Sequence, residues 1–338
     1  MIKAYLGLLL IFLIVSCKSD TAKIVKNTNS GSALGTTYSM IYFSTEKLDF
    51  RKEIDSVFAV MNQSLSTYIP TSDISKINKG DSTIVVNQMF QEVFQLSKNI
   101  FKKTNGYFDP TVGTLVNAWG FGPGKQIKMD SAAVDSLLKY VGFHKVRLAE
   151  DNTIRKQSPA IYFDFNAIAK GYAVDRLAVL LNEKGIENYL VEVGGEIVVR
   201  GENTQKQKQW MLGVDDPQMG EERTSKAFLF LKDKGLASSG NYRKFRIDSI
   251  TGKKYVHTIN PKTGYTKNSN VLGATVIANT CAEADAYATS FMAMDLKDTQ
   301  SLLKSQKTLE AYIIYLDKNG DTQEFMTEGF RQLVVNKK

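Results

Sequence analysis

The sharpest chemical signal in the sequence is a carboxylate and a hydroxyl one helical turn apart. Asp285 and Thr289 lie at positions i and i+4 of an alanine-rich stretch, residues 282–289, that predicts a helix. Their oxygens suit Mg²⁺, which usually completes its shell with water and substrate phosphate oxygens. The flanking alanines give a low surface that a ligand or another backbone can approach. The alternative is an aspartate that complements the helix dipole, with Thr289 in the core.

A second candidate site is the polar turn between a predicted buried strand, residues 161–163, and a predicted helix that follows Asn166. A helix start offers unpaired N–H groups and a positive dipole end, which favour anionic ligands. Asp164 and Lys170 bracket this turn with opposite charges. Either the two form a structural ion pair or they belong to a ligand site.

Three further stretches could contribute. His257 ends a predicted strand, where an imidazole can act as a general base near neutral pH, although a single histidine is more often structural. The apolar loop of residues 107–113 must be packed, either as a ligand loop or as a buried connector. The hydroxyl-rich stretch 237–242 is a possible anion-binding turn. The glycine turn of residues 192–196 is explained by a hairpin.

The whole-chain properties exclude some function classes. Hydrophobic residues make up 43% of the 338 residues and charged ones 23%, as in a folded globular protein. The net charge is +8, but Lys and Arg are scattered, so the sequence predicts no nucleic-acid partner. The glycine patterns of P-loop and Rossmann nucleotide sites are both missing.

The N-terminus predicts export and lipidation. One lysine, a short apolar stretch and the sequence Ile-Val-Ser-Cys at residues 14–17 resemble a lipoprotein signal with its lipobox. We therefore expect a signal peptide at residues 1–16, a lipid on Cys17, a polar tether at residues 17–32 and a single domain at residues 33–338. The alternative is an ordinary signal peptide that contains a cysteine. Cys281 then remains as the other thiol, expected to pack as a small apolar residue.

The predicted elements give an α+β fold with mixed or antiparallel sheets and packed helices. Apolar residues recur at helical spacing in residues 53–65, 88–103 and 131–140, and a helix is expected to run from the polar turn to about Leu181. Short strands are expected at residues 37–43, 145–155 and 189–193, and they dominate residues 210–278.

Taken together, these stretches resemble the ApbE family of bacterial FAD:protein FMN transferases, from about Gly35 to Phe330. Each matching block is weak by itself, but their shared order along nearly the whole mature chain is specific. The blocks are residues 34–40, 66–68, 108–113, 164–175, 192–196, 238–242, 257–261 and 284–289.

The resemblance implies a fold with two closely packed subdomains and an active site in the cleft between them. It also implies that FAD is split with Mg²⁺, that FMN passes to a Thr or Ser hydroxyl of a partner flavoprotein subunit, and that AMP leaves. The metal ligands would be Asp285, Thr289 and the backbone carbonyl of Ala167. The FAD contacts would be Met40, Tyr68, Tyr107, Phe108, Asp109, Asp164, Lys170 and Ile259.

His257 is the candidate general base, and Asp285 is expected to be essential for catalysis. The expected acceptor belongs to a membrane redox complex, and the enzyme is expected to face the periplasm from a bacterial membrane, the inner rather than the outer one. Two alternatives stay open. Water could replace the acceptor, giving an FAD pyrophosphatase, or the chain could be a lipoprotein that binds FAD without turnover.

Overall fold

The computed structural model of the chain describes residues 23–216, 225–240, 245–247, 254–267 and 270–335. Eight strands form one sheet in which every neighbouring pair is antiparallel. In spatial order they are β1 (Val25–Ala33), β2 (Thr36–Ser44), β5 (Tyr189–Val193), β6 (Glu196–Arg200), β9 (Lys234–Gly240), β12 (Val271–Ala278), β13 (Glu310–Leu316) and β14 (Thr322–Met326). Within the described residues no helix is long and apolar enough to cross a membrane.

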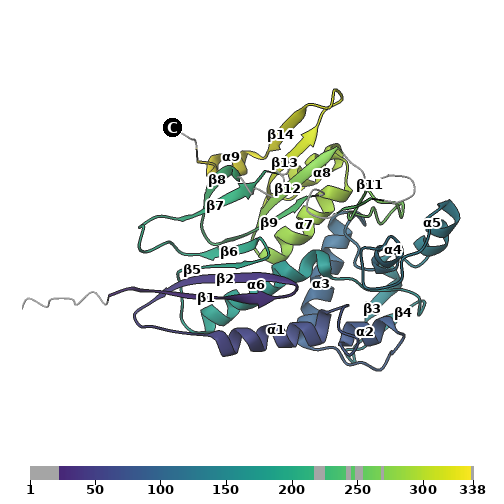
Figure 1. The fold of residues 1–338 in the computed structure, drawn as a ribbon, viewed down its shortest axis with the longest axis horizontal. Coiled ribbons are helices and arrows are strands. Elements are labelled where there is room, and N and C mark those ends of the chain that lie inside the picture. The colour runs from purple at the N-terminus through teal and green to yellow at the C-terminus, as the bar shows by residue number, and fades with distance from the viewer. Residues whose placement is uncertain (1–22, 217–224, 241–244, 248–253, 268–269, 336–338) are drawn as a thin grey trace, which may run out of the picture.

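Two long helices cover the inner face of the sheet (Figure 1). They are α6 (Asn166–Glu183) and α7 (Cys281–Ala293). Behind them pack α1 (Arg51–Leu65) and α3 (Gln88–Lys103), whose apolar faces have the helical period that the sequence predicts. The main hydrophobic core fills the space between these layers.

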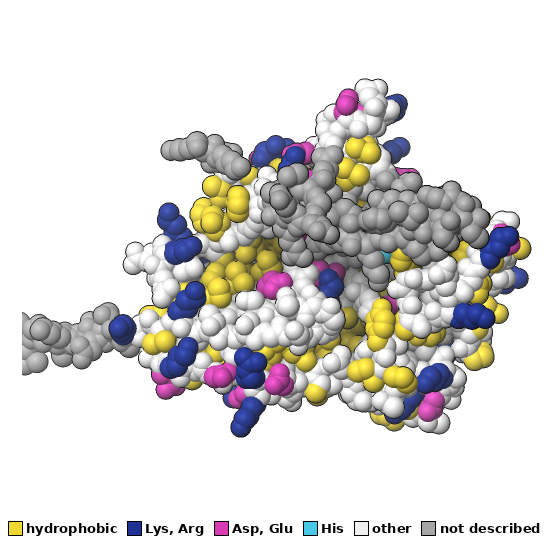
Figure 2. Space-filling view, in the orientation of Figure 1, with side chains coloured by type: hydrophobic (Ala, Val, Ile, Leu, Met, Phe, Trp, Pro, Cys, Tyr) yellow, Lys and Arg dark blue, Asp and Glu magenta, His cyan; other side chains and the backbone are white. Residues whose placement is uncertain are grey.

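The opposite face of the sheet carries a second, smaller core. The hairpin β7 (Trp210–Asp215) and β8 (Ser225–Leu231) packs there together with α9 (Glu328–Leu333). Half-buried apolar side chains of β2, β5 and β6 border this core, and Figure 2 shows hydrophobic side chains gathered over β5 and β6. On the face drawn in Figure 2 the basic side chains of the described residues are spread out with acidic ones among them.

The remaining elements are short and lie around the helical side of the molecule (Figure 1). A third small core joins two of them to Ile259. They are α2 (Asp73–Asn78), α4 (Gly113–Ala118), α5 (Ser131–Leu138), the 3-10 helix η1 (Phe143–Lys145), β3 (Val146–Leu148), β4 (Ile154–Lys156), β10 (Phe245–Ile247), β11 (Lys254–Val256) and α8 (Leu296–Ser305).

The predicted α+β class with antiparallel sheets is therefore confirmed. The predicted tether, however, is wrong for residues 25–32, because these belong to β1 at the edge of the sheet. Side-chain bonds fasten this polar strand: the amide of Asn27 donates to Ser44 at 2.8 Å, and that of Asn29 to Asp49 at 2.6 Å. The predicted signal peptide and Cys17 lie outside the described residues.

Two of the local predictions are also wrong. Residues 161–163 form no sheet strand; Tyr162 makes a single parallel bridge to Val112. The segment is extended because the amide of Asn78 both donates to and accepts from the backbone of Phe163, at 2.9 and 2.7 Å. Residues 237–240, predicted as a turn, are the last part of strand β9, and residues 241 and 242 lie outside the described residues.

Candidate functional site

A cavity of about 800 Å³ lies between the helices and the end of strand β9. This volume is within the usual range for sites that bind small molecules. Side chains from segments far apart in sequence line it, namely the end of α1, the loops at residues 66–69 and 107–112, the start of α6, the end of β9, residues 257–261 and α7.

The cavity gathers nearly all of the predicted site residues. Those that line it are Tyr68, Tyr107, Phe108, Asp109, Asp164, Ala167, Lys170, His257, Ile259, Asp285 and Thr289. Met40 is the exception. Alternation along β2 directs its side chain into the main core, where it is fully buried, so the structure contradicts a side-chain contact from Met40 to a ligand in this cavity.

The α7 side of the cavity presents Asp285 and Thr289 one turn apart, as the spacing predicts. Asp285 is almost completely buried, and its Oδ2 accepts a hydrogen bond of 3.0 Å from the backbone N–H of Gly171. Burial raises the pKa of Asp285, while the Lys170 charge and the Gly171 bond act in the opposite direction. The Thr289 hydroxyl lies 3.3 Å from the hydroxyl of Ser239 on β9.

That bond from Gly171 has a consequence for Ala167. In an α-helix the N–H of residue 171 is the donor to the carbonyl of residue 167. Because this N–H is also directed to Asp285, the Ala167 carbonyl at the cavity has at most a share of its usual donor. An under-satisfied carbonyl, a carboxylate and a hydroxyl are hard oxygen donors of the kind that Mg²⁺ takes.

Lys170 has an ion-pair partner that the sequence did not indicate. Its ammonium lies 2.6 Å from the carboxylate of Glu196, whose side chain is only 2% exposed. Glu196 opens strand β6 directly after the glycine turn, which is the hairpin that the sequence favoured. Among the described residues, four carboxylates line the cavity, those of Asp109, Asp164, Glu196 and Asp285, together with the ammonium of Lys170.

The start of α6 is held in place by side chains from other elements. The Lys156 ammonium donates to three carbonyls, those of Ile77, Pro159 and Ile161, at 2.8, 3.0 and 2.8 Å. The Asp164 carboxylate accepts from the N–H of Asn166, the first residue of α6, at 2.8 Å. The cavity turn is thus anchored from both sides before any ligand binds.

The loop at residues 107–113 is packed, as its composition predicts. The Asp109 carboxylate accepts from the N–H and the hydroxyl of Thr111 at 2.8 and 2.6 Å and from the N–H of Phe143 at 3.2 Å. Burial nevertheless raises the pKa of Asp109 to about 6. Tyr107 is partly exposed at the cavity, with the Lys262 ammonium 4.6 Å from its ring centre.

His257 follows β11 directly and is half-buried at the cavity wall. The histidine lies in the same cavity as Asp285 and Lys170. No cluster of three or more His, Cys, Asp or Glu side chains suited to a metal occurs in the part of the chain that the structure describes.

Sequence reasoning missed three residues that hold this site together. Asn78 and Lys156 brace the segment that leads to Asp164, and the Asp175 carboxylate accepts from two N–H groups of α7. The available signal was an acidic residue, Asp175, that directly follows the apolar run of residues 172–174 in a predicted helix. A charge at such a position needs a partner.

Comparison with known proteins agrees with this architecture. The ApbE family model matches residues 34–313. The chain is 31% identical to the FAD:protein FMN transferase of Haemophilus influenzae, covering 96% of this chain and 95% of that protein. It is 34% identical to the enzyme of the same name from Vibrio cholerae, over 78% of this chain and 80% of that one. The solved structure of the Vibrio cholerae flavin transferase ApbE superimposes with a TM-score of 0.80 at 29% identity, covering 92% of this chain and 99% of that structure.

Proposed function

Because the chain belongs to the ApbE family and is an FAD:protein FMN transferase, we propose that the 800 Å³ cavity binds FAD together with Mg²⁺. The observation that supports this proposal is that Asp285, Thr289 and Ala167 all line this one cavity. We propose that the enzyme moves FMN to a Thr or Ser hydroxyl of an acceptor flavoprotein and releases AMP.

The metal site of this proposal consists of one carboxylate, one hydroxyl and one carbonyl. These donors fit Mg²⁺, since that ion usually keeps several positions for substrate oxygens and water. Bound there, Mg²⁺ would supply positive charge beside the pyrophosphate. The ion also explains how a cavity with four carboxylates accepts an anionic substrate.

The protein's own groups bind and orient the reactants. Tyr68 and Tyr107 offer aromatic faces for the flavin or adenine ring, and Lys170, fixed by Glu196, reaches a phosphate or ribose oxygen. His257 accepts the proton of the acceptor hydroxyl as that oxygen attacks the FMN-side phosphorus. The phosphorus–oxygen bond to AMP then breaks, so catalysis consists mainly of positioning and charge neutralisation.

The test is the variant Asp285→Ala, assayed with FAD, Mg²⁺ and candidate acceptor subunits by mass spectrometry for added FMN. We expect transfer to be abolished. The matched control is Glu283→Ala, on the same helix but outside the cavity lining. Undiminished transfer by Asp285→Ala would overturn the metal assignment. Steady AMP release without an acceptor would instead identify an FAD pyrophosphatase, and FAD binding without turnover would identify a carrier protein.

We also propose that the enzyme is exported, lipidated at Cys17 and held at the periplasmic face of the inner membrane, where it would meet the acceptor subunit of a redox complex. The lipobox-like residues 14–17 support this proposal. Incorporation of a fatty-acid analogue into the wild type, and its loss in Cys17→Ser, would test it. A Cys17→Ser protein that remains labelled would contradict it.

A further inference from the structure

Two carboxylates join α6 and α7: Asp285 accepts from the N–H of Gly171, and Asp175 accepts from the first turn of α7. Asp175, in the middle of α6, accepts from the N–H of Cys281 with one oxygen and from the N–H of Ala282 with the other, both at 2.8 Å. These N–H groups belong to the first turn of α7, where backbone donors have no partner within their own helix. The bonds therefore fix the start of α7 at one point along α6.

Two glycines bring the backbones together at the same point. A Cβ on Gly171 would lie 2.4 Å from the carbonyl oxygen of Cys281, and a Cβ on Gly235 of β9 would lie 2.4 Å from the nitrogen of Cys281. Gly171 is one turn before Asp175, so both act from the same face of α6. The first turn of α7 is therefore enclosed by α6 on one side and by strand β9 on the other.

The side chains of Tyr287, Phe291 and Met292 pack α7 into the main core, whereas its alanines contribute only small contacts. Alanine occupies four of the positions between Cys281 and Thr289, and such short side chains form shallow ridges. A helix rises about 1.5 Å per residue, whereas metal–ligand distances tolerate only about 0.2 Å. The distance from the α7 ligands to Ala167 therefore depends on the register of α6 and α7, to which the Asp175 bonds contribute together with the Asp285–Gly171 bond.

We propose that Asp175 is a positioning residue of the flavin-transfer site. Its two hydrogen bonds to the first turn of α7 set Asp285 and Thr289 opposite the Ala167 carbonyl. This inference rests on the proposed metal site. The role differs from ordinary helix capping, because Thr280 already caps α7 by accepting from the N–H of Glu283 at 3.2 Å. Asp175 is the residue that connects this helix end to the other ligand-bearing helix.

The matched comparison is Asp175→Ala against Thr280→Ala. Both remove hydrogen bonds from the first turn of α7, but only Asp175→Ala removes the bonds that join this turn to α6. Mg²⁺ binding is measured by calorimetry on the full chain without acceptor. We expect the Mg²⁺ dissociation constant to rise about tenfold or more in Asp175→Ala, as for residues that orient metal ligands, and to stay within about threefold of wild type in Thr280→Ala.

Cys281 supplies a second readout that needs no metal. Its thiol is fully buried in the wild type, and a Cys17→Ser background leaves it as the sole thiol of the chain. We expect Asp175→Ala to accelerate labelling of Cys281 by a thiol reagent about tenfold under native conditions, through local opening of the α7 start. Asp175→Asn, which keeps one acceptor oxygen, should give an intermediate rate and remains usable if the alanine variant folds poorly.

The possible results of these experiments distinguish a failure of the Asp175 positioning role from a failure of the proposed metal site. Wild-type Mg²⁺ affinity in Asp175→Ala or Asp175→Asn, or equal effects of Asp175→Ala and Thr280→Ala, would overturn the positioning role and leave the proposed function standing. A wild-type protein that binds no Mg²⁺ would overturn the metal site and the inference together. Weakened Mg²⁺ binding and faster labelling confined to the Asp175 variants would support the inference.

Discussion

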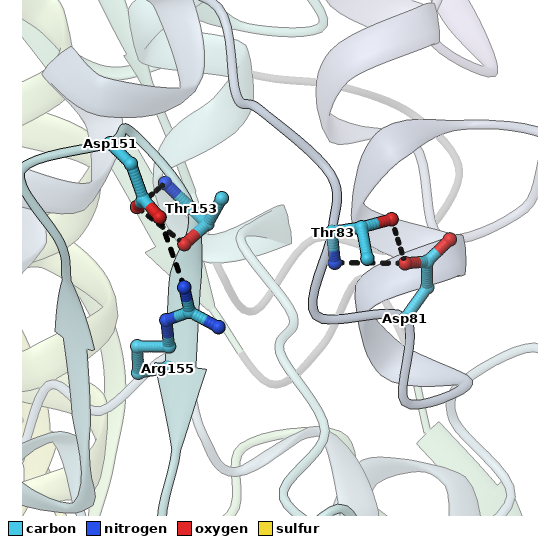
Figure 3. A network of polar contacts seen from close by, with 5 residues as sticks. All are labelled: Asp81, Thr83, Asp151, Thr153 and Arg155. Carbon is cyan, nitrogen blue, oxygen red and sulfur yellow. Dashed lines mark hydrogen bonds and ion pairs between the residues drawn. The ribbon is translucent and has the colours of Figure 1, made fainter.

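The sequence Asp-x-Thr occurs in three loops that fold alike but differ in surroundings. In Figure 3 the Asp81 carboxylate accepts from the N–H and hydroxyl of Thr83 at 2.9 and 2.7 Å, and Asp151 does the same for Thr153 at 3.1 and 2.6 Å. Asp109 makes the corresponding pair of bonds at the cavity. The local hydrogen-bonding pattern is thus common to all three.

The pKa values of the three carboxylates are shifted in different directions. Hydrogen bonds from threonine lower the pKa values of Asp81 and Asp151, which are exposed, with a further contribution from Arg155 at Asp151. At Asp109 burial outweighs the same bonds and raises the pKa. The comparison teaches that the local Asp-x-Thr motif determines the hydrogen-bond geometry of the turn. Burial determines the pKa of the carboxylate: an exposed aspartate is a solvated cap, whereas the buried one beside the cavity carries the free-energy cost of a desolvated charge.

The largest loss of stability among the three turns should follow from Asp109→Ala. The change leaves the N–H groups of Thr111 and Phe143 without their acceptor inside the protein, and each buried unsatisfied donor costs about 1–3 kcal/mol. We expect the free energy of unfolding, measured in urea, to fall by about 2–4 kcal/mol, and FAD binding to weaken. A loss no greater than that of Asp81→Ala would contradict the distinction between buried and exposed turns.

The pH dependence should have opposite signs in the two environments. Burial raises the pKa of Asp109 in the folded protein to about 6, from an ordinary value of 3.8. The folded state therefore binds more protons between about pH 4 and pH 6, and the stability of wild type relative to Asp109→Asn should fall as the pH rises through that window. Relative to Asp151→Asn, wild type should gain stability as the pH rises toward 4, because the folded pKa of Asp151 is lowered. Urea titrations of the three proteins at several pH values would test this, and parallel curves would contradict it.

The smallest expected effects are the changes in Tm that distinguish the two exposed turns, those of Asp81 and Asp151. Asp151 also forms an ion pair of 3.0 Å with Arg155, whereas Asp81 has only its threonine. We expect Asp81→Ala to lower Tm by no more than about 2 °C and Asp151→Ala to lower it slightly more. Thermal scans in low and high salt provide the measurement, because the extra loss at Asp151 should shrink as salt screens the pair.

The helices and most strands could be predicted because their signals are local. Apolar residues recur at helical spacing in α1 and α3. This pattern can be recognised in the sequence without knowing the surface against which each helix packs. The Asp285–Thr289 pair was found in the same way, since i and i+4 meet on any helix. The motif blocks then grouped residues from separate elements, and the structure places all but Met40 of those candidates at one cavity.

The errors arose where the partner of a segment, rather than the segment's own composition, decides its structure. Strand β1 is polar and carries no strand signal of its own, yet it pairs with β2 along its length. Residues 161–163 have the composition of a strand, but a side chain of α2 occupies the place of a neighbouring strand. Lys170 meets Glu196 only because the β5–β6 hairpin returns to the start of α6.

The pairing of β2 with β5 has a consequence for how the protein folds. The hairpin β1–β2 is a local structure, but its contact with β5 encloses residues 45–188, which contain every helix from α1 to α6. Contacts of such high sequence separation slow folding, because a long loop must be closed before its contacts stabilise anything. We therefore expect a late step in refolding at which β2 joins β5. Until that step the apolar side chains of β2 remain exposed, and chaperones or aggregation would compete for them.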